Sequence, residues 1–173
     1  MIRKPIPLDF VASRIKLDWN DVQFGFLNGW LGWKDVVELA TQAVQSGESD
    51  ADVVSLASVG KEDRSVIDDL LRALSTKTKP DGDSRKKWFF LALAWLYEHE
   101  SQYPDSLAEV EAIASAFGFP PESYDMLKFM PSSGEYDPVQ HPRSENLRRL
   151  RERWRKFVEQ QSRIYGAGVG EAG

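Results

Sequence analysis

The sequence predicts an all-α fold: a single-domain bundle of about seven or eight helices around one central hydrophobic helix. Three observations favour it. Apolar residues recur every three or four positions along much of the chain, which is the spacing of one helix face. No segment of any length alternates apolar and polar residues as a half-buried strand does. Residues 88–97, WFFLALAWLY, are all apolar, so a helix here is apolar on every side and needs other helices around it.

This apolar run is the basis for a central helix over residues 84–100. Basic residues precede it at Arg85-Lys86-Lys87, and Glu98-His99-Glu100 follows it. A membrane-spanning helix needs about 20 apolar residues, so the run is too short to cross a bilayer. We therefore expect it in the core of a water-soluble protein, with no membrane partner.

Local signals predict the helices that precede the central one. Asp18 and Asp21 match a capping box for a short helix, and Gly29 follows that helix where a left-handed residue is common. Apolar spacing predicts further helices over residues 33–45, from Asp50 to residue 57, and over residues 62–74. Residues 1–16 are expected to form an extended N-terminal arm.

The C-terminal half is predicted to contain three helices and one loop. Apolar spacing predicts a helix over residues 107–117, and Pro120-Pro121 begins a short one. Residues 131–142 are rich in Pro and Gly and are expected to form a loop. A long amphipathic helix is predicted over residues 144–165, followed by a flexible tail at residues 166–173. Its apolar stripe comprises Leu147, Leu150, Trp154, Phe157, Gln161 and Ile164.

Composition excludes several kinds of chemistry. The chain has no cysteine, which excludes disulfides, thiolate metal sites and a cysteine nucleophile. This is compatible with the cytoplasm, and the N-terminus lacks the apolar core of a signal peptide. The net charge of −5 is uneven: residues 143–173 carry +4 and the rest −9. The acidic part favours basic partners and repels nucleic acid, whereas the basic segment could do the reverse.

Candidate catalytic groups are few. Only two histidines exist, and His99 ends the central helix, where a cap or a surface position is more typical than a metal ligand. The many carboxylates are expected on solvated helix faces. The sequence contains neither a phosphate-binding glycine loop nor a nucleophile elbow. We therefore expect a non-enzymatic protein with no cofactor, no metal and no catalytic residue.

The last predicted helix carries a basic cluster that suggests one alternative function. Its members are Arg148, Arg149, Arg151, Arg153, Arg155 and Lys156, with Arg143 just before them. These side chains could contact phosphates of a nucleic acid, with Trp154 as a stacking plane. The interpretation we favour is that Trp154 lies in the core and the arginines pair with acidic groups of the protein.

Several segments resemble, in order, the motifs of an uncharacterised family of small bacterial proteins. They are WNDVQFGFLNGWLGW at residues 19–33, KWFFLALAWLYE at 87–98, PDSLAEVEAI at 104–113, FGFP at 117–120 and FMP at 129–131. The resemblance spans roughly residues 17–165. It implies a domain of unknown function with no catalytic residues to carry over. Small stand-alone families of this kind are often suspected to be immunity proteins, which neutralise a toxin. One departure is SAFGFP at residues 115–120, where the family would have acidic and aromatic residues before Pro120.

These observations lead to three functional hypotheses. The first is a cytoplasmic protein-binding module, such as an immunity protein or inhibitor, which covers a toxin whose surface is basic. Its candidate contacts are Asp50, Asp52, Glu62, Asp63, Asp68, Asp69 and Tyr136. The second is a nucleic-acid-associated module that uses the basic helix, and the third is a protein with an acidic small-molecule site.

Overall fold

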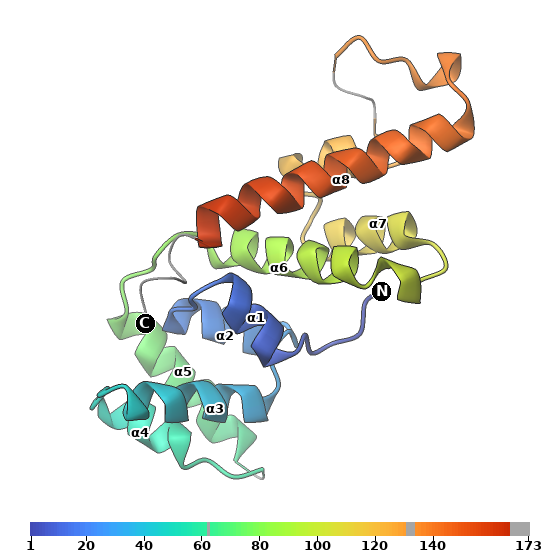
Figure 1. Ribbon diagram of the computed structural model, residues 1–173. Coiled ribbons are helices and arrows are strands. Elements are labelled where there is room, and N and C mark those ends of the chain that lie inside the picture. The colour runs from blue at the N-terminus through green and yellow to red at the C-terminus, as the bar shows by residue number, and fades with distance from the viewer. Residues whose placement is uncertain (62, 131–133, 167–173) are drawn as a thin grey trace. The chain divides into compact units, whose positions relative to one another are not determined.

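The computed structural model describes residues 1–61, 63–130 and 134–166. These residues form eight α-helices and three short 3-10 helices, with no strand among them, which confirms the all-α prediction (Figure 1). Contacts divide the chain into two compact units. We call Arg3–Trp88 the N-terminal unit, and Met1–Ile2 together with the residues from Phe89 onward the C-terminal unit. The prediction of a single domain over residues 1–173 stays a prediction.

The N-terminal unit contains five helices and the first turn of a sixth. They are α1 (Leu8–Arg14), α2 (Trp19–Leu27), α3 (Trp33–Gln45), α4 (Ala51–Ala57) and α5 (Arg64–Lys77). Helix α3 packs against α4, and α5 packs against both α2 and α4 (Figure 1). Helix α1 corrects the expected extended arm over residues 1–16. It forms because Val11 is fully buried, with Pro7 preceding the helix and Asp9 in its first turn, where a carboxylate is favourable.

A buried carboxylate holds the N-terminal unit together. Asp18 and Asp21 form the predicted capping box, each side chain accepting a hydrogen bond of 2.9 Å from the other residue's backbone N–H. Asp21 is fully buried, and its carboxylate also accepts 2.7 Å bonds from Ser84 Oγ and Lys87 Nζ. Burial raises the pKa of Asp21, although the bonds from Lys87 and Ser84 act in the opposite direction. We call these four residues the Asp21 clasp; it joins α2 to the first turn of helix α6 (Ser84–Glu98).

Two glycines of the first family-like motif have structural roles. Gly25 faces the Trp88 indole so closely that an added Cβ would lie 2.3 Å from Cζ2. Trp88 is fully buried, and its Nε1 donates a 2.8 Å hydrogen bond to the Asp21 carbonyl. Gly29 has φ +77°, the left-handed conformation expected after α2, and Trp30 N–H then bonds back to the Gly25 carbonyl. Gly29 therefore permits a tight turn after α2, and Gly25 permits a close contact between α2 and Trp88.

The C-terminal unit begins within α6. Its other elements are η1 (Glu100–Gln102), α7 (Ser106–Ala116), η2 (Pro121–Met126), η3 (Pro138–Gln140) and α8 (Arg143–Gly166). Residues 88–94 of α6 are all buried, which confirms the prediction of a buried apolar helix. Trp154 of α8 is fully buried and donates from Nε1 to the Leu93 carbonyl at 3.1 Å. Helix α8 thus packs on α6 through a core tryptophan.

The apolar stripe of α8 is only partly buried. Trp154 and Val158 are buried, and Phe157 packs edge-on against Phe89 with ring centroids 5.6 Å apart. Ile164 is exposed, so the predicted stripe does not reach the end of the helix. Gly166 is the last residue of α8, and the rest of the predicted flexible tail, residues 167–173, lies outside the described residues. No helix in the described parts of the chain has the length and apolarity to cross a membrane.

Candidate functional site

Three of the six predicted acidic contact residues, Asp50, Asp52 and Asp69, lie in ion pairs. Lys77 of α5 binds both Asp50 and Asp52 at the start of α4, with Nζ–Oδ2 distances of 2.8 and 2.6 Å. The hydrogen bonds from Lys77, and then the one from the Asp52 backbone N–H, lower the pKa of Asp50. One cation of the same unit is therefore shared by the two acids and compensates half of their charge.

The other described acidic residues of the set lie at the start of α5 and within its first half. Asp63 is exposed just before α5, Asp68 is half-buried, and Asp69 is exposed and pairs with Arg72 at 3.4 Å. Glu62 lies outside the described residues. Tyr136 belongs to the C-terminal unit, whereas all five aspartates belong to the N-terminal unit. That these residues form one contact surface stays a prediction.

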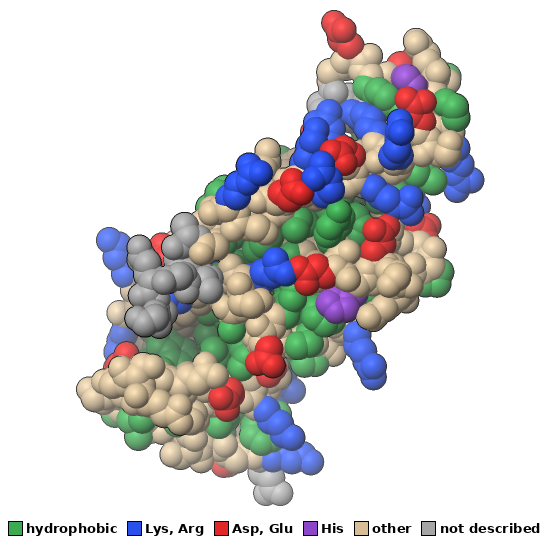
Figure 2. Space-filling model, in the orientation of Figure 1, with side chains coloured by type: hydrophobic (Ala, Val, Ile, Leu, Met, Phe, Trp, Pro, Cys, Tyr) green, Lys and Arg blue, Asp and Glu red, His purple; other side chains and the backbone are tan. Residues whose placement is uncertain are grey.

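The predicted basic cluster on α8 is interrupted by carboxylates. Arg155 binds Glu152 and Glu159 of the same helix, and Arg151 binds Glu100 at 2.9 Å. The bonds from Arg155 lower the pKa of Glu152. Arg148, Arg153 and Lys156 are exposed, with no ion pair to any described residue. Lys and Arg side chains gather where α8 begins, with acidic side chains between them (Figure 2).

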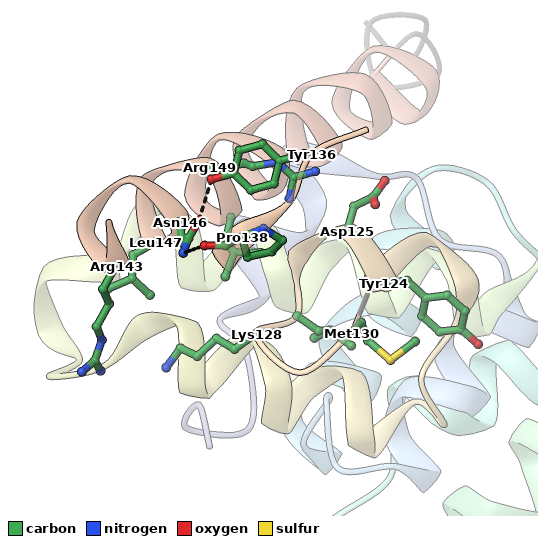
Figure 3. A pocket seen from close by; sticks show the side chains of 12 residues that line it. Tyr124, Asp125, Lys128, Met130, Tyr136, Pro138, Arg143, Asn146, Leu147 and Arg149 are labelled. Carbon is green, nitrogen blue, oxygen red and sulfur yellow. Dashed lines mark hydrogen bonds between the residues drawn. The ribbon is translucent and has the colours of Figure 1, made fainter. Parts of the chain in front are cut away.

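The structure brings together two residues from different predicted sets. Tyr136, expected to contact a protein, and Arg149, expected to contact nucleic acid, line the same cleft of about 220 Å³ in the C-terminal unit (Figure 3). The Arg149 guanidinium lies 4.1 Å from the centroid of the Tyr136 ring, a cation–π contact. We call this cavity the α8 cleft; its walls are η2 and the residues after it, the loop at residues 134–142, and the first two turns of α8.

One asparagine ties the loop to α8. Tyr136 Oη donates a 2.6 Å hydrogen bond to Asn146 Oδ1, and Asn146 Nδ2 donates to the Pro138 carbonyl at 2.9 Å (Figure 3). His141 stacks on the Tyr136 ring with a centroid distance of 4.5 Å, and its Nδ1 lies 3.3 Å from a Glu145 carboxylate oxygen. These contacts hold the Tyr136 ring, and with it Arg149, in a defined position.

Three cations and one carboxylate line the α8 cleft: Lys128, Arg143 and Arg149, with Asp125. Lys128 forms an ion pair with Asp105, with Nζ–Oδ distances of 3.0 and 3.2 Å. This contact is the main reason why the pKa of Asp105 is lowered. Arg149 Nη2 is buried and finds no hydrogen-bond acceptor among the described residues. Leaving a buried donor unpaired costs about 1–3 kcal/mol, and more for a charged group. The residues that line the cleft therefore carry a net positive charge, and one of them, Arg149, has an unsatisfied buried donor.

Three exposed aromatic side chains occur beside this cleft in the sequence and the structure: Phe119, Tyr124 and Phe129. They are 38%, 40% and 58% exposed, and we call them the aromatic cluster. Phe119 and Phe129 meet edge to face with centroids 5.7 Å apart, while Tyr124 lines the α8 cleft itself. Phe119 has φ +53°, a left-handed conformation that costs a bulky residue about 1–2 kcal/mol. The chain thus tolerates strain where it displays an aromatic side chain.

His99 contacts Trp95, which lies four residues earlier in α6. Its Nδ1 donates a 2.8 Å hydrogen bond to the Trp95 carbonyl near the end of α6, and its ring stacks on that of Trp95 at 3.6 Å. Within residues 1–61, 63–130 and 134–166, no three His, Asp or Glu side chains are grouped in a way that could hold a metal ion.

Sequence reasoning missed several residues of this region. Asn146 and Lys128 carry no signal, because isolated polar residues of these types occur on any helix or loop. The aromatic cluster does have a signal: Phe119, Tyr124 and Phe129 surround a short proline-initiated helix that is too small to bury all three.

Comparison with known proteins places the chain in a family. The model of a family described as uncharacterized protein conserved in bacteria (DUF2247) matches residues 8–162. Neither the search of curated proteins nor that of solved structures returned a match. The match covers most of the chain, including the Gly25 contact, the Asp21 clasp and both sides of the α8 cleft. The chain therefore belongs to DUF2247, an uncharacterised family conserved in bacteria.

Proposed function

We propose that this protein is a non-enzymatic binding module that inhibits another protein by covering part of its surface. The observation that carries the proposal is the aromatic cluster beside the α8 cleft. Exposed aromatic and arginine side chains supply most of the binding energy in protein interfaces, and they concentrate around pockets. The toxin–immunity relationship suggested by the family resemblance is one form of such inhibition.

The proposed contact surface differs from the acidic one expected from net charge. Asp50, Asp52 and Asp69 already have cationic partners, which supports a role for them in solubility and local stability. The aromatic cluster instead lies next to the positive lining of the cleft. Its partner would therefore present apolar side chains bordered by acidic ones, rather than a basic face.

Site-specific crosslinking in the native cell tests the proposal. The photoreactive residue p-benzoylphenylalanine replaces Phe129 in one variant and Val54 in the control. Val54 is also an exposed apolar residue, but it lies on α4 of the N-terminal unit. We expect one protein to be captured from position 129 and not from position 54. Equal capture at both positions, or none at position 129, would contradict the proposed surface.

The captured protein then allows a quantitative test. Phe129→Ser is expected to weaken its binding about 30-fold, as loss of a strong interface contact does, while Val54→Ser leaves affinity unchanged. Inhibition is tested by expressing the partner alone, which should arrest growth, and together with this protein, which should restore it. A partner that is harmless alone would refute the toxin–immunity form of the proposal, and a partner whose own activity is unchanged by this protein would refute the inhibitor function.

A further inference from the structure

The α8 cleft has the size of a site for a small molecule or a single side chain. Its volume is about 220 Å³. Sites for cofactors and drug-sized ligands usually measure about 300–1,000 Å³, whereas an apolar cavity of about 150 Å³ can hold benzene. The cleft therefore matches a benzene-sized body with a small polar group attached.

Five apolar residues line the cleft. Leu147 and Leu150 belong to α8, and Leu127, Met130 and Pro138 belong to the other walls; Met130, Pro138 and Leu147 are labelled in Figure 3. Leu127 is buried, and Met130, Leu147 and Leu150 are half-buried, so these side chains supply an apolar wall that is partly shielded from solvent. Such a wall favours a ligand with an apolar body and gives little to a bare inorganic ion.

The polar group of a ligand for this cleft must be an anion. Arg149 has an unsatisfied buried Nη2, and Arg143 lines the same cavity. A guanidinium only donates hydrogen bonds, so the missing partner must be an acceptor. A carboxylate fits best, because it satisfies the donor and compensates the charge at once. Asp125 also lines the cleft, but the lining still has more cations than carboxylates.

Arg149 is positioned before any ligand arrives. The guanidinium stacks on Tyr136, whose hydroxyl is bonded to Asn146 and whose ring is stacked by His141. A preorganised donor loses little conformational entropy on binding, so even a small ligand gains affinity from it.

We propose that the α8 cleft binds a carboxylate carried on a benzene-sized apolar body, with the carboxylate on Arg149 Nη2 and the body against Leu147 and Leu150. This site does not depend on the proposed inhibitor function. The carboxylate could come from a free small molecule or from a partner protein, and a competition experiment separates these sources.

The probe is sodium benzoate, titrated into the full-length protein and followed by amide chemical shifts in NMR. Sodium chloride at equal ionic strength is the salt control, and benzamide is the neutral control of the same shape. A ligand with so few atoms is expected to bind with a Kd of about 1 mM. Benzamide and inorganic phosphate should bind at least about tenfold more weakly, because one lacks the charge and the other the apolar body.

Matched variants assign the binding to Arg149. Arg149→Gln should weaken benzoate binding about tenfold, whereas Arg148→Gln, the same charge change at the exposed neighbour, should leave it unchanged. Arg149→Lys keeps the charge but lacks the planar pair of donors, so it should lose less benzoate affinity than Arg149→Gln. Such an intermediate affinity would show that the loss in Arg149→Gln does not come from a folding defect. Equal binding of benzamide, equal losses at positions 148 and 149, or no shift at about 20 mM benzoate would overturn the site.

Competition between benzoate and the partner protein identifies the source of the carboxylate. If saturating benzoate abolishes crosslinking from position 129, the partner protein supplies the group. If benzoate binds and crosslinking persists, the site takes a free small carboxylate. Failure of crosslinking with intact benzoate binding would refute the inhibitor function and leave the site standing.

Discussion

Gly25→Ala is expected to destabilise the protein although alanine is the better helix former. The new Cβ would lie 2.3 Å from Trp88 Cζ2 and 2.7 Å from Cε2. Carbon atoms in contact normally lie about 3.5–4.0 Å apart, so the indole must move by more than about 1 Å. Trp88 has no exposed surface, and a shift of this size also breaks its hydrogen bond to the Asp21 carbonyl.

The magnitude follows from three contributions. Overpacking of a filled core costs about 1–3 kcal/mol. Loss of the hydrogen bond between the Trp88 N–H and the Asp21 carbonyl costs about 1–3 kcal/mol more. Against these, replacing glycine by alanine within a helix gains about 0.8–1 kcal/mol. The expected net loss in the free energy of unfolding is about 2–4 kcal/mol, which urea unfolding followed by circular dichroism and tryptophan fluorescence measures.

A second substitution separates the clash from any other effect of the methyl group. Phe in place of Trp88 lacks the indole atoms that the new Cβ meets, so Gly25→Ala should cost little in a Trp88→Phe background. Gly166→Ala, where no atom lies within 4 Å of the added Cβ, is the neutral control. An unfolding free energy for Gly25→Ala within about 0.5 kcal/mol of the parent, or an equal loss in both backgrounds, would refute the contact argument.

Three further predictions concern the buried ion pair, the acidic pair and the cleft. Lys87→Met should lower the free energy of unfolding by about 3–5 kcal/mol, because it leaves the Asp21 carboxylate buried without its cation; adding Asp21→Asn should recover part of this loss in the same urea assay. Lys77→Met should raise the pKa of Asp50 in a carboxyl NMR titration. The folded-state pKa of Asp50 is lowered, so its ionised carboxylate stabilises the folded protein above the unfolded pKa of about 3.9, and this stabilisation is lost as the pH falls through the folded-state pKa. An unchanged pKa of Asp50 in the variant would contradict the pairing with Lys77. Asn146→Ala should speed amide hydrogen exchange across residues 134–142 and leave exchange in α3 unchanged, and unaltered loop exchange would show that Asn146 does not hold the loop.

The fold was predictable because its helices have local signals. The Asp18 and Asp21 pair specifies the start of α2 through contacts three residues apart, and the apolar spacing predicts α3 over the same residues, 33–45, that the structure shows. Helix α1 was missed because nothing local favours it strongly. It depends on the burial of Val11 and Ile15 in the folded protein, and sequence spacing over two helical turns does not report that burial.

The candidate site was much less predictable, for the same reason. Lys77 neutralises Asp50 from 27 positions away, so counting charges along the chain overstated the exposed acidity. Tyr136 and Arg149 were each singled out, but for different partners, because no periodicity carries through the loop between them. Only the folded chain shows that the two side chains stack in one cleft.

The Asp21 clasp has a consequence for how the protein is made. Ser84 and Lys87 lie 63 and 66 positions after Asp21 in the sequence. Trp88, which packs against Gly25, lies 67 positions after Asp21. A nascent chain therefore carries all of α1 through α5 before it contains the residues that neutralise and cover Asp21. During that interval the carboxylate must stay hydrated, because burying it alone is unfavourable. The N-terminal unit can thus complete its fold only after synthesis has entered α6, so the helix that begins the second unit also determines when the first one closes.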